Sequence, residues 1–122
     1  MRVVTLELGG RSVRVGVPER RSERMRGLRD RAARELDGLL FHRTRSIHTM
    51  GMDRAIVAAL LDRDLRVLDV LELPPGKIVL PRPRVRHVLE LLERVELNRG
   101  ERVGGYTVAA APGRGGTGAR EA

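Results

Sequence analysis

The sequence contains no cysteine and no tryptophan. The absence of cysteine excludes disulfide bonds and thiolate metal sites, so the fold does not depend on an oxidising compartment. Aromatic residues are limited to Phe41 and Tyr106. Proteins that bind single-stranded nucleic acid usually stack bases on several aromatic side chains, and this chain lacks such a platform.

Long apolar runs are also missing. The N-terminal stretch alternates apolar and polar residues, unlike the continuous apolar segment of a signal peptide. No run approaches the roughly 20 apolar residues that span a bilayer. These absences predict a cytoplasmic protein without a transmembrane segment. The length of 122 residues predicts a single globular domain over residues 1–110. We expect the Gly/Arg-rich tail at 111–122 to be disordered.

Positive charge dominates, and the formal net charge is +8. Lys77 is the only lysine, so nearly all the basic residues are arginines. Most of them are scattered, and only residues 81–87 (PRPRVRH) form a dense group. A basic surface binds phosphate backbones without sequence specificity. Nonspecific association with nucleic acid is therefore one candidate function, although the scarcity of aromatic residues weakens it.

Alternating apolar residues predict two hairpins. Residues 3–8 and 12–17 alternate around Gly9-Gly10, which can take the positive φ angles of a tight turn. Residues 55–61 are apolar throughout and too short for a typical helix, which indicates a buried strand. After the turn at 62–64, residues 66–73 (RVLDVLEL) form the strand that returns beside it.

The remaining segments predict short elements. Residues 19–28 are polar and suit a short helix that ends at Gly27. Residues 46–50 and 106–110 suit short strands. Residues 85–95 are ambiguous, because their apolar residues have helical spacing while the VLEL core also fits a strand. The sequence thus predicts an α+β fold, with a small, strongly curved, mainly antiparallel sheet or partial barrel and one or two short helices.

No catalytic or metal-binding motif is present. The only histidines, His42, His48 and His87, do not have the spacing of metal ligands on one helix. No serine lies in a GxSxG motif, and no phosphate-binding glycine motif leads into a helix. We therefore predict no metal, no cofactor and no catalytic residue, and a non-catalytic protein is favoured over an enzyme.

Two carboxylates stand out because they lie inside apolar runs. Glu72 and Glu90 are each flanked by leucine and valine. An unpaired carboxylate is costly to bury, so each of them either faces solvent, has an arginine partner or forms the wall of a pocket. The methionines Met50 and Met52, beside His48, fit either a core or the lining of an irregular pocket.

The order of several short motifs resembles domain of unknown function 192, a family of bacterial and archaeal proteins. The resemblance covers about residues 13–103. It is carried by Glu23-Arg24 with Gly27-Leu28, by residues 38–41 (GLLF), by His48-Thr49 with Met52, by the apolar run that ends in Leu61-Asp62, by residues 88–91 (VLEL) and by Gly100-Glu101.

The resemblance implies an α+β fold with a strongly curved sheet, no established activity, and a strand at residues 88–91. It also implies a pocket between the Glu-Arg-x-x-Gly-Leu segment and the His-Thr-x-x-Met segment. The ligand-binding residues that it implies are Arg24, Phe41, His48, Thr49 and Met52, with Glu90 as their neighbour.

The chain departs from the family pattern at three places. Ala55 and Val57 replace a proline and an aspartate, and Arg29 replaces the methionine after Gly-Leu. The stretch before Gly100 is shortened and lacks a glycine. If the aspartate carries the family's function, this chain lacks it.

The sequence favours a small binding or accessory domain that holds a polar or anionic ligand, or a segment of a partner protein, near Arg24 and His48. Nonspecific nucleic-acid binding is the first alternative. An enzyme that uses Glu90 or His48 as a base is the second, but a base without a nucleophile, metal or second acid is incomplete.

Overall fold

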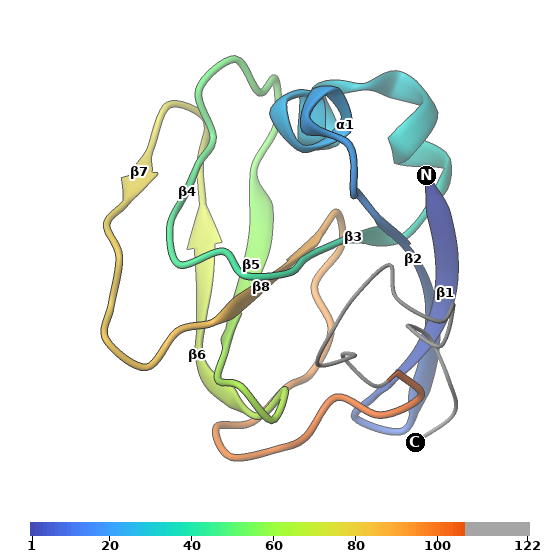
Figure 1. Ribbon diagram of the computed structural model, residues 1–122, viewed down its shortest axis with the longest axis vertical. Coiled ribbons are helices and arrows are strands. Elements are labelled where there is room, and N and C mark those ends of the chain that lie inside the picture. The colour runs from blue at the N-terminus through green and yellow to red at the C-terminus, as the bar shows by residue number, and fades with distance from the viewer. Residues whose placement is uncertain (107–122) are drawn as a thin grey trace.

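The computed structural model describes residues 1–106 (Figure 1). The tail predicted at 111–122 lies outside the described residues, as does the strand predicted at 106–110 except for Tyr106. Short strands predominate in the part of the chain that is described. In chain order the elements are β1 (Arg2–Leu8), β2 (Arg11–Val17), α1 (Arg21–Arg26), the 3₁₀ turns η1 (Gly27–Arg29) and η2 (Arg31–Glu35), β3 (Gly38–Phe41), β4 (Ile47–His48), β5 (Ile56–Leu61), β6 (Val67–Leu73), β7 (Ile78–Val79) and β8 (His87–Leu91).

The first predicted hairpin is confirmed. Strands β1 and β2 pair in antiparallel fashion, with Leu6 opposite Val13. Gly9 and Gly10 both have positive φ angles, 52° and 83°, which is the backbone that a two-residue hairpin turn needs. Leu6 and Val13 are buried together with the apolar residues two positions along each strand, so the alternation in the sequence reports the buried face correctly.

The second predicted hairpin is confirmed as well. Strands β5 and β6 pair in antiparallel fashion, with a bulge between Leu60 and Leu61. In the turn that joins them, the Asp62 carboxylate accepts hydrogen bonds from the backbone N–H groups of Asp64 (2.8 Å) and Arg66 (3.0 Å). Strand β4 is shorter than the predicted strand at 46–50 and pairs only with β7.

Six strands form one mixed sheet in the order β1-β2-β3-β8-β5-β6. All neighbours are antiparallel except β2 and β3, which are parallel. Parallel neighbours cannot be joined by a tight turn and need a crossover. Residues 18–37 supply this crossover and include α1, η1 and η2, which Figure 1 shows at one end of the sheet.

The α+β class and the mainly antiparallel sheet are confirmed, but the strong curvature and the partial barrel are wrong. The sheet is open, with β1 and β6 at its two edges. These edges do not pair with each other because the segment at 100–104 lies between them. It forms isolated bridges from Gly104 to Glu7 and from Arg102 to Arg66, so each edge finds hydrogen bonds without closure.

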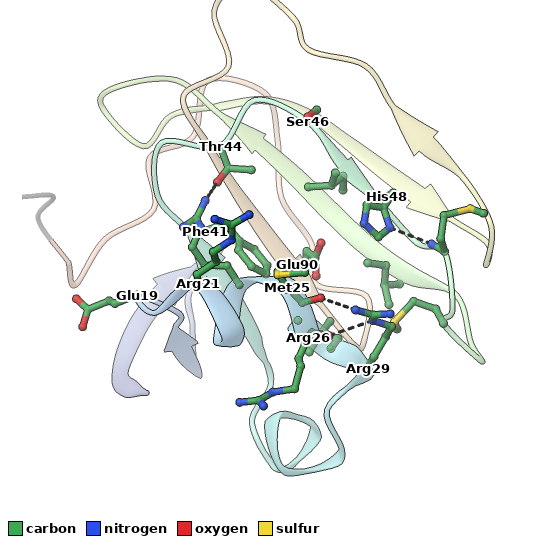
Figure 2. Close-up of a pocket in the computed structure, with 17 residues that line it drawn as sticks. Glu19, Arg21, Met25, Arg26, Arg29, Phe41, Thr44, Ser46, His48 and Glu90 are labelled. Atoms are coloured by element: carbon green, nitrogen blue, oxygen red, sulfur yellow. Dashed lines mark hydrogen bonds between the residues drawn. The ribbon is translucent and has the colours of Figure 1, made fainter.

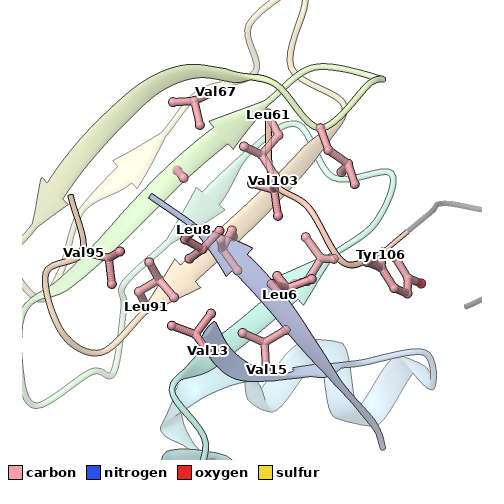
Figure 3. Packing of buried hydrophobic residues seen from close by; sticks show 14 of the residues in the cluster. Leu6, Leu8, Val13, Val15, Leu61, Val67, Leu91, Val95, Val103 and Tyr106 are labelled. Atoms are coloured by element: carbon pink, nitrogen blue, oxygen red, sulfur yellow. The ribbon is translucent and has the colours of Figure 1, made fainter. Parts of the chain in front are cut away.

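The sheet has an apolar core on each face, because its central strands are buried on both sides. Leu40, Ala59 and Leu89 contribute to the first core, with the side chains of the β1–β2 hairpin and of Val103 (Figure 3). Their neighbours along β3, β5 and β8 contribute to the second core, with Leu28 and Ala33 from the crossover. The second core lies beneath the crossover segment.

Residues 87–91 form a strand, so the ambiguity in the sequence is resolved against the helix. Strand β8 lies at the centre of the sheet between β3 and β5. Val88 and Leu89 are both fully buried, on opposite faces. A strand that is buried on both faces reads as a continuous apolar run, which explains why the alternation of a half-exposed strand was missing.

No helix within residues 1–106 has the length and apolar character needed to cross a membrane.

Candidate functional site

A pocket of about 480 Å³ lies between the crossover segment and the second face of the sheet (Figure 2). Its lining comes from α1 and η1 on one side, from β3, β5 and β8 of the sheet, and from the loop around β4. Segments that are far apart in the sequence thus meet around one cavity of the size that small-molecule ligands occupy.

Five of the six residues predicted to bind a ligand line this pocket. They come from the helix, the sheet and the loop around β4, and their common position is the main feature that the sequence predicted. The five residues are Arg24, Phe41, His48, Met52 and Glu90.

Arg24 is held in place by the loop that follows β3. Its guanidinium donates hydrogen bonds to the Thr44 hydroxyl oxygen (2.5 Å) and to the His42 carbonyl oxygen (3.2 Å). It also lies 5.8 Å from the centre of the Phe41 ring, within the range of a cation–π contact. Arg24 therefore fixes the loop at 42–44 against α1 and brings its charge to the pocket.

His48 lies at the exposed side of the pocket. Its Nδ1 accepts a hydrogen bond from the Met50 backbone N–H (3.2 Å), as Figure 2 shows. This bond leaves the proton of the neutral ring on Nε2. The ring can therefore donate a hydrogen bond to a ligand through Nε2.

Thr49 is the exception, and its assignment as a ligand-binding residue is not supported. It is fully buried and is not among the residues that line the pocket. Its hydroxyl donates a hydrogen bond to the Pro74 carbonyl (2.6 Å) and accepts one from the Lys77 N–H (2.8 Å). Thr49 instead fastens the segment around β4 to the turn before β7, because its side chain satisfies two backbone groups of that turn.

We expect Thr49→Val to lower the free energy of unfolding by about 2 kcal/mol, because the two hydrogen bonds of this buried hydroxyl are lost. Thr49→Ser keeps the hydroxyl and serves as the control, with a loss of less than half as much. Urea denaturation of the two variants measures the difference. A loss in Thr49→Ser that exceeds the loss in Thr49→Val would show that the methyl group, and not the hydroxyl, stabilises this turn.

Glu90 forms the floor of the pocket. It is the central residue of β8, its cross-strand neighbours are Leu39 and Ala58, and only 6% of its surface is exposed. No residue within 1–106 hydrogen bonds to its carboxyl or forms an ion pair with it. Burial therefore raises the pKa of Glu90 from 4.5 to about 7, because the charged form loses its hydration.

The other carboxylate within an apolar run has the opposite environment. Glu72, on β6, is exposed and forms an ion pair with Arg94. Of the alternatives that the sequence left open, Glu72 faces solvent with an arginine partner, and Glu90 forms a pocket wall.

Apart from Arg24, sequence reasoning missed the residues that α1 and η1 contribute. Arg21, Arg26 and Arg29 line the pocket beside Arg24, so four arginines line the same pocket as the buried carboxyl of Glu90. Met25 also lines it while 63% exposed. The signal for Met25 was present, because it is the single apolar residue of the helix sequence RSERMR.

A second cluster of polar rings lies apart from the pocket lining. The His42 and His87 rings meet edge to face, with centroids 5.6 Å apart. His42 Nε2 is 2.7 Å from the Tyr106 hydroxyl, which also accepts a hydrogen bond from Arg2 (3.0 Å). Burial is the main cause that lowers the pKa of His42 to about 4. Two of the three histidines of the sequence therefore lie side by side.

The dense basic segment at 81–87 is partly engaged with the protein itself. Arg82 forms an ion pair with Asp69 (3.0 Å), and Arg86 donates to the Pro83 carbonyl (2.6 Å). Val85 and His87 are buried. Residues 81–84 are exposed, so only the end of this segment packs against the domain.

The chain matches no family model, no curated protein and no solved structure. Residues 1–106 contain no group of three or more histidine, aspartate or glutamate side chains placed to hold a metal ion. Physical features of the pocket are therefore the basis for any functional conclusion.

Proposed function

We propose that the protein is a small binding module that holds a ligand with an anionic group in the pocket between α1 and the sheet. The observation that carries this proposal is the lining of the pocket, which contains four arginines and only two glutamates, Glu19 and Glu90. Arginine binds carboxylates and phosphates through a planar set of donors. Arg21 supports this role because it has no hydrogen bond or ion pair within residues 1–106.

The proposal includes divergent membership of domain of unknown function 192. The segments that carry the resemblance contribute Arg24, Phe41, His48 and Met52 to one pocket, which is the arrangement the family pattern implies. Val57, which replaces the family's aspartate, packs in the first core. That position lies on the sheet face opposite the pocket, so an aspartate missing there removes no group from the pocket of this chain.

The experiment compares two pairs of arginines. Arg21→Gln/Arg29→Gln removes two charges at the pocket. Arg11→Gln/Arg63→Gln removes two charges from exposed arginines outside the pocket lining, which have no partners within residues 1–106. Binding of phosphate, acetate, hexanoate and citrate is screened by thermal shift and measured by calorimetry.

We expect at least one anion to bind, and its affinity to fall tenfold or more in the pocket pair while staying within twofold in the control pair. Equal losses in both pairs would mean that the net charge, and not the pocket, attracts anions. This result would favour the nucleic-acid alternative, in which binding weakens steeply with salt. If no anion binds, the proposal is wrong.

A proton-transfer enzyme is the second candidate, because the pKa of Glu90, about 7, suits a general base at neutral pH. If the protein turns over a substrate, we expect Glu90→Gln to abolish the activity and His48→Gln to reduce it only in part. Turnover that is unchanged in Glu90→Gln would eliminate this candidate.

A further inference from the structure

The Glu90 carboxyl is open to the pocket and has no partner within residues 1–106. A buried carboxylate is stabilised when a donor, above all a charged donor, pairs with it. Because Leu39 and Ala58 flank Glu90 within the sheet, the donor has to enter from the pocket. A protonated nitrogen gives the strongest such pair, since its hydrogen bond is charge-assisted.

The exposed side carries mainly the opposite charge, since Glu19, which also lines the pocket, is paired with Arg2 (3.0 Å). Arg21, Arg26 and Arg29 are exposed on α1 and η1, and Arg24 is partly buried beside them. No arginine within residues 1–106 forms an ion pair with Glu90. The pocket therefore leaves the Glu90 carboxyl unpaired with its positive groups, and a ligand with a single charge pairs with only one of the two.

The rest of the lining includes apolar side chains. Met25, Met52, Phe41 and Ile56 contribute to it. Methionine side chains adapt to apolar groups of varied shape. The pocket thus combines a buried acidic group, apolar side chains and exposed basic side chains.

We propose that the ligand is a small zwitterion with an apolar body, whose cationic nitrogen binds the Glu90 carboxylate and whose anionic group stays at the arginines of α1 and η1. This inference rests on the proposed function, to which it adds the second charge of the ligand. It places amino acids, ω-amino acids and short peptides in the class of ligands.

The test uses matched sets in which the zwitterion, the acid and the amine share one carbon skeleton. The sets are phenylalanine with 3-phenylpropanoate and 2-phenylethylamine, 4-aminobutanoate with butanoate and butylamine, and 6-aminohexanoate with hexanoate and hexylamine. Affinities are measured by calorimetry on the full chain at pH 8, where the Glu90 carboxyl is ionised because its pKa is about 7.

In at least one set we expect the zwitterion to bind at least tenfold more tightly than the acid and the amine. Glu90→Gln, which keeps the shape of the side chain, should reduce this advantage to less than twofold. Glu72→Gln removes the same charge from an exposed position on β6 and should leave the advantage unchanged.

Each other result overturns the inference in a recognisable way. If the acid binds as well as the zwitterion in every set, the ligand needs no cationic nitrogen, and the proposed anion pocket stands without this addition. If the amine binds best, the arginines do not select the ligand and the proposed function fails as well. An advantage that survives Glu90→Gln would place the nitrogen elsewhere.

Discussion

Glu90→Gln should stabilise the protein, relative to the wild type, by about 3 kcal/mol more at pH 8 than at pH 4. Burial raises the pKa of Glu90 from 4.5 to about 7, and each pKa unit corresponds to about 1.4 kcal/mol. The folded state therefore holds this proton more tightly than the unfolded state. The contribution of the Glu90 proton to the stability of the wild type is fully present below pH 4.5. It is lost as the pH rises, and this loss levels off above pH 7.

The measurement is the free energy of unfolding by urea at several pH values, for the wild type and for Glu90→Gln. The difference between the two curves is needed because His42 acts in the opposite sense. Its pKa is lowered from 6.5 to about 4, so its contribution is lost as the pH falls from 6.5 to 4. That contribution is common to both proteins and cancels in the difference.

Glu72→Gln is the matched control, because it makes the same change in an exposed ion pair with Arg94. Its difference from the wild type should vary by less than about 1 kcal/mol over the same range, as exposed ion pairs do. If the difference between Glu90→Gln and the wild type does not change with pH, then in the folded protein either water hydrates this carboxyl or a neighbouring group pairs with it.

Gly38→Ala should lower the free energy of unfolding by about 3 kcal/mol, the upper end of the cost of overpacking a core. Gly38 begins β3 and lies against β8. A Cβ atom at this position would lie well under 3.0 Å from the Glu90 carbonyl oxygen and 2.9 Å from a methyl group of Leu91. Strand β8 is hydrogen bonded to β3 and β5, so it cannot move aside without breaking the centre of the sheet.

The control for this substitution is Gly104→Ala. A Cβ atom there would lie 3.5 Å from the Cβ of Glu7, an ordinary contact distance, and we expect a loss below about 1 kcal/mol. Urea denaturation compares the two variants. If they lose the same stability, the close approach of β3 to β8 does not constrain the sheet. Because the added Cβ atom would displace the backbone of Glu90, Gly38→Ala should also weaken ligand binding to the pocket.

Local sequence determined most of the strands and turns. Alternation placed β1 and β2, the Gly9-Gly10 pair supplied their turn, and the apolar run at 55–61 predicted β5. These features follow from the period-two geometry of a strand and from the φ angles that a turn needs. The convergence of Arg24, His48 and Glu90 came from the motif resemblance, because spacing along the chain does not give distance in space.

The tertiary structure decided what those elements face. The apolar run around Glu90 fitted either a solvent face or a pocket wall, and the place of β8 at the centre of the sheet selected the wall. Thr49 lay in the same motif as His48, but it follows the end of β4, and its hydroxyl bonds to the turn near Pro74. The local sequence pattern also could not show whether the sheet closes. The segment at 100–104 pairs with both edge strands, β1 and β6, and it is distant from both in the chain. Burial and pairing depend on neighbours that are distant in the chain, and only the assembled fold specifies them.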